Sequence, residues 1–360
     1  MPKNKLYSKS TKSRALFSRI LKYFLICFGS IAFLIIAFAV WIYFSLISGP
    51  DSMEISEFHP FKSSKARTEY LAFEDKMAEK WPVISEEKII ETSYGKTFMR
   101  ISGPIDGPTL VLLPAGGANS LIWHANIKAL SSVYRTYALD NIYDYGRSIY
   151  TRKMETPNDF SQWLNELFDT LSFGNDIRIA GYSYGGWVTG NYAASHPDRL
   201  SRVILIAPIF SIQPVTKDFV WDMFLGLLPC KYMRRRSIYS IWNDLVLSGE
   251  AGKKTADDRV EYINIAMKSF KFKFGVEPNT LTDAELKKLK MPVLFLIGEN
   301  EKVCNPQLAI DRLNKVAPGI KTELISGTGH DLLFTHSDEI NNMMLEFLPK
   351  IFRITGFLSH

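Results

Sequence analysis

Ser183 is the residue in this sequence whose surroundings point most directly to chemistry. It lies in GYSYGG, residues 181–186, between the apolar stretch DIRIA and a segment typical of a helix. Glycine at positions 181 and 185 would let a strand and a helix approach closely while the serine is held at the tip of a sharp turn. A glycine-rich turn at a helix start is the plainer interpretation. The strand, turn and helix context favours a nucleophile elbow, in which the serine hydroxyl attacks an acyl group.

A serine hydroxyl is a weak nucleophile at neutral pH and needs a neighbouring base that a third group orients. The sequence contains six histidines, and His330 is the candidate base. It lies in SGTGHDLLF, directly after the last expected strand, where the flanking glycines would let the loop reach Ser183. The other five fall in helices, at helix ends or in outlying segments, where surface or packing roles are the usual ones.

The acid that orients the base is expected after a strand, between the serine and the histidine in chain order. The stretch FLIGENEKVCNP offers Glu299 and Glu301 in such a loop. We favour Glu301, because the first carboxylate after the glycine more often turns outward or braces the loop, and Glu299 is the alternative. Cys304 nearby is interpreted as a packing residue.

An acyl-transfer site also needs donors for the developing oxyanion, and rigid backbone amides are the usual ones. The amide of Tyr184, directly after the candidate nucleophile, is the first expected donor. The second is expected in PAGGANS, which follows the apolar stretch TLVLLP, with Gly116 the first choice and Gly117 the next.

The elements that must position these residues follow from the hydrophobic pattern. Strands that are apolar throughout and alternate with helices indicate a mainly parallel sheet covered on both faces. A hairpin of two strands around Gly95 precedes this alternation. The expected strands are residues 109–114, 134–140, 176–183, 202–208, 291–300 and 321–327, and the expected helices are 120–131, 159–173, 184–196, 307–317 and 338–352.

The alternation breaks between Ile209 and Lys290, where the sequence predicts several aromatic-rich helices inserted as a cap over the carboxyl ends of the strands. The expected organisation has six parts. They are a basic cytoplasmic segment (1–22), a transmembrane helix (23–47), a stalk and packing helix (48–84), the first part of the core (85–208), the cap (209–290) and the second part of the core (291–360).

The membrane prediction depends on charge and hydropathy. Seven of the 43 basic residues and no acidic residue precede Asp51, which leaves 36 basic against 37 acidic residues in the rest of the chain. The near-neutral remainder argues against a nucleic-acid binder. The uncharged run from Tyr23 to Ile47 exceeds the roughly 20 residues that a helix needs to cross a bilayer. The basic flank predicts that the catalytic domain lies on the extracytoplasmic side. A cleaved signal peptide, whose apolar core would be shorter, is the alternative.

The three cysteines exclude a disulfide-built domain. Cys27 lies in the apolar run, and Cys230 and Cys304 could pair only if the fold brings them together. Their spacing matches no metal site, and no metal or organic cofactor is expected.

GYSYGG, LIGENE, GTGH and LPAGGANSLIW together resemble the α/β-hydrolase superfamily, from about Ser85 onward. YALDNIYDYGRS and the GENE loop look like bacterial carboxylesterases. The resemblance implies a mostly parallel sheet of about eight strands, and a bracing role for Asp140. Its serine nucleophile argues against the dehalogenase and epoxide hydrolase branches. One departure is that Pro114 and Ala115 stand where members commonly carry His-Gly, which bears on the second amide donor.

The sequence therefore predicts a membrane-anchored serine esterase that acts on an apolar or lipid-like ester through an acyl-enzyme, with Ser183, Glu301 and His330 as its triad. Acyl transfer to another acceptor, or lipase, lactonase, peptidase or carbon–carbon hydrolase activity, would use the same triad. A binding or scaffold protein that kept the fold and lost activity is the rival from another class.

Overall fold

The computed structural model describes residues 21–23, 29–30, 55–273 and 275–348. The chain divides into two compact units, residues 1–54 and 55–360. Of the first unit, the described residues 21–23 and 29–30 are helical, and the rest of the predicted basic segment and transmembrane run lies outside the described residues. In the part of the chain that the structure describes, no helix has both the length and the apolar character needed to cross a bilayer.

The second unit is built on one nine-stranded sheet, with the order β1-β2-β4-β3-β6-β7-β8-β9 and β5 paired to β2. The strands from β4 to β9 along this order run parallel, while β1 and β2 form the predicted antiparallel hairpin. The mainly parallel sheet is thus confirmed. The strands are β1 Glu86–Thr92, β2 Gly95–Ser102, β3 Thr109–Leu113, β4 Arg135–Leu139, β5 Ile149–Tyr150, β6 Ile177–Tyr182, β7 Leu200–Ile206, β8 Val293–Gly298 and β9 Lys321–Ile325.

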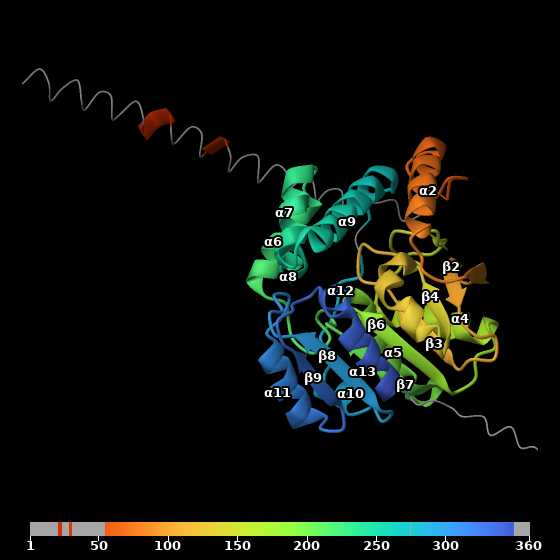
Figure 1. Cartoon of the computed structure of the whole chain (residues 1–360). Helices are drawn as coiled ribbons and strands as arrows, with labels where there is room; N and C mark the ends of the chain where they lie inside the picture. The colour runs from red at the N-terminus through yellow and green to blue at the C-terminus, as the bar shows by residue number, and fades with distance from the viewer. Residues whose placement is uncertain (1–20, 24–28, 31–54, 274, 349–360) are drawn as a thin grey trace, which may run out of the picture. The chain divides into compact units, whose positions relative to one another are not determined.

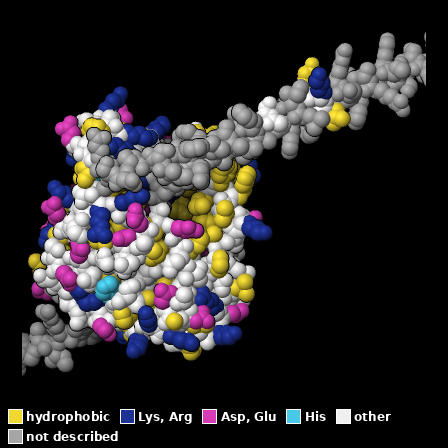
Figure 2. Space-filling model, turned by 180° about the vertical axis from the view of Figure 1, so that it is seen from behind, with side chains coloured by type: hydrophobic (Ala, Val, Ile, Leu, Met, Phe, Trp, Pro, Cys, Tyr) yellow, Lys and Arg dark blue, Asp and Glu magenta, His cyan; other side chains and the backbone are white. Residues whose placement is uncertain are grey.

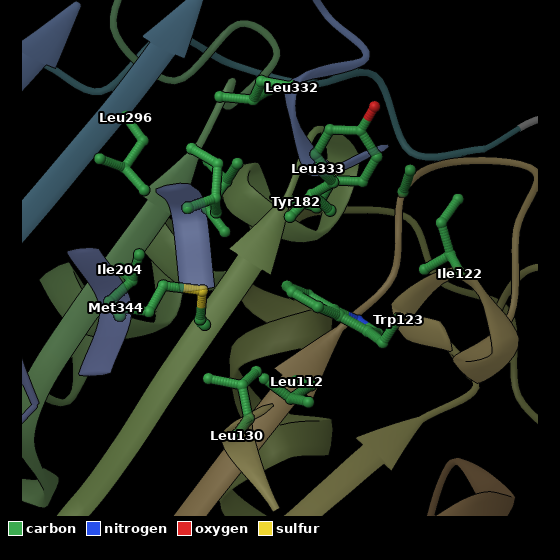
Figure 3. Close-up of a cluster of buried hydrophobic side chains, with 14 of the residues drawn as sticks. Leu112, Ile122, Trp123, Leu130, Tyr182, Ile204, Leu296, Leu332, Leu333 and Met344 are labelled. Carbon is green, nitrogen blue, oxygen red and sulfur yellow. The ribbon is translucent and has the colours of Figure 1, made fainter. Parts of the chain in front are cut away.

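Helices cover both faces of this sheet, as the apolar character of the central strands requires (Figure 1). On one face, strand side chains such as Leu112, Tyr182 and Ile204 pack against Trp123 and Met344 in a fully buried cluster (Figure 3). The helices on that face are η1 Ser120–Ala125, α3 Ile127–Leu130, α12 Leu332–Thr335 and α13 Ser337–Phe347.

Because successive strand residues point to opposite faces, the equally buried Val111, Ile179 and Val203 face the other side of the sheet. Helices α4 and α5 pack against each other and against strands there. A capping box between Thr156 and Asp159 starts α4, which has Pro157 at its first position. The bounds are α4 Pro157–Thr170, α5 Tyr184–Ser195, η2 Pro197–Arg199, α10 Asp283–Leu286 and α11 Pro306–Val316.

The predicted insertion is helical, and its helices gather at one end of the sheet (Figure 1). They hydrogen-bond to loops at the carboxyl ends of strands: Arg259 to the loop after β3, Thr216 to the loop after β8, and Leu245 to the loop after β9. Helix α2, from the segment before the core, packs on α9 through a 2.9 Å hydrogen bond between Tyr70 and Tyr262. The bounds are α2 Ser64–Ala78, α6 Lys217–Leu227, α7 Lys231–Ile241, α8 Asn243–Leu247 and α9 Glu250–Ser269.

One predicted element differs from the structure. Residues 120–131 were expected as a single helix, and they form the 3₁₀ segment η1 and the short helix α3 with a break at Asn126. The Asn126 side chain is fully buried and donates to the Asn341 side chain (2.9 Å) and to the Leu333 carbonyl (3.4 Å). A buried amide needs such partners, and they lie about 200 residues away in the chain, beyond the reach of a local pattern.

Candidate active site

Ser183 occupies the tight turn between β6 and α5, as the sequence predicts. Its backbone has φ 54° and ψ −115°, a conformation that residues other than glycine adopt rarely. A Cβ atom on Gly181 would lie 2.2 Å from the Gly185 carbonyl oxygen, and one on Gly185 would lie 2.5 Å from the Leu113 carbonyl oxygen. Both glycines are therefore required for the strand and helix to approach.

The structure brings the three predicted triad residues together from loops that are far apart in the chain. His330 Nε2 lies 2.9 Å from Ser183 Oγ, and His330 Nδ1 lies 2.9 Å from Glu301 Oε2. The three residues are 7%, 6% and 8% exposed, in the order Ser183, His330 and Glu301. They form a continuous hydrogen-bonded chain that is largely shielded from water.

The two candidate acids lie in different environments. Glu301 Oε1 accepts a hydrogen bond from the Val303 amide (2.8 Å), which fixes the carboxylate while Oε2 faces His330. The Glu299 carboxylate instead accepts from the Gly327 amide at 3.2 Å and braces the neighbouring loop. The structure thus places Glu301, the favoured candidate, on the imidazole. Burial raises the pKa of the nearby Cys304 thiol to about 12, so that it stays protonated near neutral pH.

The histidine loop has further supports that no sequence motif indicated. The buried Tyr182 hydroxyl donates to the His330 carbonyl at 2.5 Å. Asp331 is also buried, and its Oδ2 accepts from the Leu245 amide at 2.6 Å, which ties the loop to the cap. These contacts fix the backbone at His330 and directly after it.

The expected oxyanion donors lie next to one another. Tyr184 is the first residue of α5, so its amide has no partner within that helix. The Gly116 loop is adjacent, because a Cβ atom on Gly116 would lie 3.3 Å from the Tyr184 Cβ. The amide of Gly117 donates to Asp144 Oδ2 at 2.8 Å and is therefore already used. Of the two glycines, Gly116 is left as the better donor.

The peptide unit that joins Gly116 to Gly117 is held from both sides. Asp144 accepts from its N–H, and Arg259 Nη2 of the cap helix α9 donates to its carbonyl oxygen at 3.0 Å. Burial raises the pKa of Asp144, while Lys273 and the Gly117 amide act to lower it. From the sequence, no role was assigned to Asp144 or Arg259. Arg259 in particular lies in DDRVEY, a pattern typical of a solvent-facing helix.

A cavity of about 230 Å³ adjoins this loop, bounded by α2, η1, α9 and Phe334 of α12. Neither Ser183 nor His330 lines it, but Ala118 and Arg259 do, so it begins beside the Gly116 peptide. Its apolar lining residues are Met77, Trp81, Ala118, Leu121, Ile122, Trp242 and Phe334.

Other predictions concern the remaining cysteines and acids. Cys230 is exposed, Cys304 is buried, and both are free thiols. Asp140 is buried, and its two oxygens accept from the amides of Ser120 and Arg147 at 2.8 Å each, so the structure places it as a brace between loops. Among the described residues, no group of three or more His, Cys, Asp or Glu side chains could hold a metal ion.

A serine, a histidine and a glutamate that are hydrogen-bonded in this way on this fold define the class of serine hydrolases with an α/β-hydrolase core. The model of the alpha/beta hydrolase fold family matches residues 108–238. Carboxylesterase YbfK of Bacillus subtilis (strain 168) is 33% identical over 273 residues, which cover 74% of this chain and 89% of that protein. The chain belongs to the α/β-hydrolase family, and it is an ester hydrolase that resembles bacterial carboxylesterases.

Two solved structures from Bacillus subtilis agree with this assignment. The crystal structure of carboxylesterase CesB (YbfK) matches with a TM-score of 0.70 at 30% identity, covering 79% of this chain and 98% of that chain. The crystal structure of naproxen esterase (carboxylesterase NP) matches with a TM-score of 0.70 at 27% identity, covering 79% of this chain and 99% of that chain.

Proposed function

We propose that this protein is a membrane-anchored carboxylesterase that cleaves an apolar or acyl ester through a covalent acyl-enzyme, with Ser183 as nucleophile, His330 as base and Glu301 as the orienting acid. The observation that carries the proposal is the chain of two 2.9 Å hydrogen bonds from Ser183 Oγ through the imidazole to Glu301. A carboxylate on Nδ1 fixes the tautomer whose Nε2 can accept a proton, and it stabilises the imidazolium that forms.

In the first step, Ser183 Oγ bonds to the ester carbonyl carbon while His330 Nε2 takes the hydroxyl proton. The carbonyl π electrons move to oxygen, where the amides of Tyr184 and Gly116 stabilise the negative charge. Collapse of this intermediate breaks the bond to the alcohol oxygen, and the alcohol leaves with the proton from His330. Water then attacks the acyl-enzyme in the same way and releases the carboxylic acid.

The apolar substrate class is supported by the cavity beside the Gly116 loop. Its aromatic and aliphatic lining residues, Trp81, Ile122 and Trp242 among them, suit a hydrocarbon or aryl group. Charged residues line it too, and two of them, Lys80 and Lys254, pair with Asp258. A lipid-like ester would place its chain there while the ester group meets Ser183. One relative of known structure is named a naproxen esterase, and the apolar lining here is compatible with an ester of an aromatic acid.

Membrane anchoring is supported by the sequence. The uncharged run of residues 23–47 is long enough to span a bilayer, and seven basic residues precede it. By the distribution of positive charge, the basic segment would stay in the cytoplasm and the hydrolase would face the other side. Protease treatment of intact cells or sealed vesicles tests this topology, because a hydrolase on the cytoplasmic side would be protected from external protease.

Hydrolysis of p-nitrophenyl esters of graded acyl length by the full chain tests the activity. We expect turnover that Ser183→Ala abolishes and that improves as the acyl chain lengthens. Thr255→Trp would narrow the cavity from the half-exposed side of α9 and lower kcat/KM for the long esters but not for the acetate ester, with Thr255→Ser as the matched control. If Thr255→Trp lowers kcat/KM equally for esters of all chain lengths, the cavity does not bind the acyl chain. Absence of any turnover that depends on Ser183 would contradict the esterase proposal.

A further inference from the structure

The outward face of cap helix α6 is apolar, which is the reverse of what a helix facing water normally presents. Five large hydrophobic residues of α6 are exposed. Trp221 is 58% exposed, and the others are Leu227 (52%), Val220 (46%), Met223 (45%) and Phe224 (38%). The residues of the opposite side of the helix, Phe219 and Leu225, are buried. We call the five exposed residues the α6 face.

The α6 face forms one continuous surface. At the helical spacing of 3.6 residues per turn, Val220, Met223, Phe224 and Leu227 fall on one side of α6, and Trp221 flanks them. The Trp221 and Phe224 rings stack with their centroids 5.5 Å apart. Figure 2 shows hydrophobic side chains gathered on the part of the surface that the cap forms, beside a hollow. A contiguous exposed patch of this kind marks an interaction surface.

The charges around the α6 face suit a negatively charged partner. The stretch 217–241, which contains α6 and α7, has five basic and two acidic residues. Of the two acidic residues, Asp222 falls on the side of α6 that carries buried Leu225, away from Met223 and Leu227. Asp218 lies one turn before Trp221, at the edge of the α6 face. Lys217 borders the α6 face, because it lies one turn before Val220 and Trp221. Lys231 and Arg236 of α7 are also exposed, and Lys231 pairs with Glu261 at 2.7 Å.

We propose that the α6 face docks on the surface of a lipid bilayer that contains anionic lipids. A helix with an apolar face that includes Trp and Phe, bordered by basic residues, is the kind that lies in the membrane interface with its apolar side buried. The chain itself favours this occupant, because only seven residues separate the uncharged run that ends at Ile47 from Ile55, where the hydrolase unit begins. A short connection to a membrane span would keep the cap within reach of the bilayer.

Docking at this face would bear directly on the site. The residue before α6, Thr216, donates from its amide to the Val303 carbonyl (2.8 Å) and from its hydroxyl to the Lys302 carbonyl (2.6 Å). These two acceptors directly follow Glu301 in the chain. Contact of α6 with lipid would therefore bring the triad loop next to the bilayer, where an acyl ester would be concentrated. The inference rests on the proposed membrane location, but its test does not depend on catalysis.

Tryptophan fluorescence can test the docking, because Trp221 is the exposed tryptophan among the described residues and the other five described are at most 9% exposed. The full chain with Trp41→Phe, which removes the tryptophan of the predicted span, is reconstituted into vesicles of phosphatidylcholine and phosphatidylglycerol. Lipids brominated on the acyl chains then quench any tryptophan in contact with them. We expect bromolipid to quench a component of the emission that disappears in Trp41→Phe/Trp221→Phe.

Replacement of Val220, Phe224 and Leu227 by serine is expected to reduce the quenching of Trp221. The matched control replaces three exposed apolar residues elsewhere, Ile84, Ile105 and Leu324, by serine and should leave it unchanged. Vesicles of phosphatidylcholine alone should give weaker quenching, because they lack the anionic headgroups.

Two results would overturn the proposal. If aqueous acrylamide quenches Trp221 and bromolipid does not, the α6 face is in water. If neither agent quenches it, another protein surface, such as a second copy of this chain, covers the face. Retention of the chain in vesicles after alkaline extraction reports the membrane span separately, and ester hydrolysis in the same sample reports the proposed activity. Failure of docking, of anchoring and of catalysis can thus be told apart.

Discussion

Ser183 adopts a backbone conformation that costs free energy, and the surrounding residues hold it there. Its positive φ is stabilised by hydrogen bonds from its amide to the Ile206 carbonyl (2.9 Å) and from the Ile209 amide to its carbonyl (3.2 Å). The hydroxyl is thereby presented to His330 without a change of backbone on each turnover. If Ser183 is the nucleophile, as proposed, strain of this kind is a form of preorganisation, since the orientation is established during folding.

The two glutamates of the acid loop permit a controlled comparison at the residue scale. We expect Glu301→Gln to lower kcat by roughly 10³-fold or more, because an amide cannot hold the imidazole in the required tautomer or stabilise the imidazolium. Glu299→Gln should stay close to wild type in kcat, since Glu299 contacts the Gly327 amide and not His330. Steady-state kinetics on one p-nitrophenyl ester measures both. A larger loss for Glu299→Gln would reverse the assignment.

Residues with a local motif could be predicted from the sequence, and residues held by distant contacts could not. The elbow around Ser183 and the loop of His330 are marked by glycines at fixed offsets, and the structure places both as expected. Arg259 carries no such mark, because its contact with Gly116 joins positions 143 residues apart. The break of the expected helix at Asn126 could not be predicted either, because the partner of its side chain, Asn341, lies 215 residues away in α13.

At the scale of elements, the cap holds the Gly116 loop, the proposed source of an oxyanion donor, through the Arg259 side chain. Arg259 of α9 donates to the Gly116 carbonyl, and Asp144 accepts from the other end of the same peptide unit. The adjacent Gly116 amide is the proposed oxyanion donor, so the cap helix helps to fix its direction. The core and the cap, which is inserted between the two parts of the core, thus both contribute residues to the candidate site.

Arg259→Met is expected to lower kcat by roughly tenfold, a smaller loss than removal of an oxyanion donor itself would give. The binding of a boronic acid that mimics the tetrahedral intermediate should weaken by a similar factor, because both effects report the Gly116 amide. Arg235→Met is the matched control, since Arg235 pairs with exposed Asp257 on the outside of the cap. Normal affinity for the boronic acid in Arg259→Met would show that the contact only supports the cap.

At the scale of the whole hydrolase unit, a buried hydrogen-bonded cluster around Glu74 ties the leading helix α2 to the sheet. Glu74 on α2 is fully buried and contacts Arg100 of β2 (3.4 Å) and Arg147 of the loop after β4 (3.0 Å). The pKa of the Glu74 carboxyl group is raised to about 8. Burial and the nearby charge of Asp140 raise it, and the two arginines act to lower it. Desolvation is the largest cause, because no water reaches the carboxyl group.

This shift predicts how stability changes with pH. Between the ordinary pKa of 4.5 and about 8, the folded protein keeps a proton on Glu74 that the unfolded chain has lost. The contribution of Glu74 is therefore fully present below pH 4.5 and is lost as the pH rises through this range. Thermal unfolding at a series of pH values should show a steeper loss of Tm with rising pH in wild type than in Glu74→Gln. A wild type that gains stability relative to Glu74→Gln over this range would contradict the shift.

The central claim is that the three loops meet to make Ser183 a nucleophile, and covalent labelling tests it most directly. The folded full chain is treated with a fluorophosphonate, and the modified residue is located by peptide mass spectrometry. We predict one adduct, on Ser183, that is absent in Ser183→Ala and strongly slowed in His330→Gln. Folded wild-type protein that takes no label at Ser183, or that labels equally fast without the imidazole, would contradict the account.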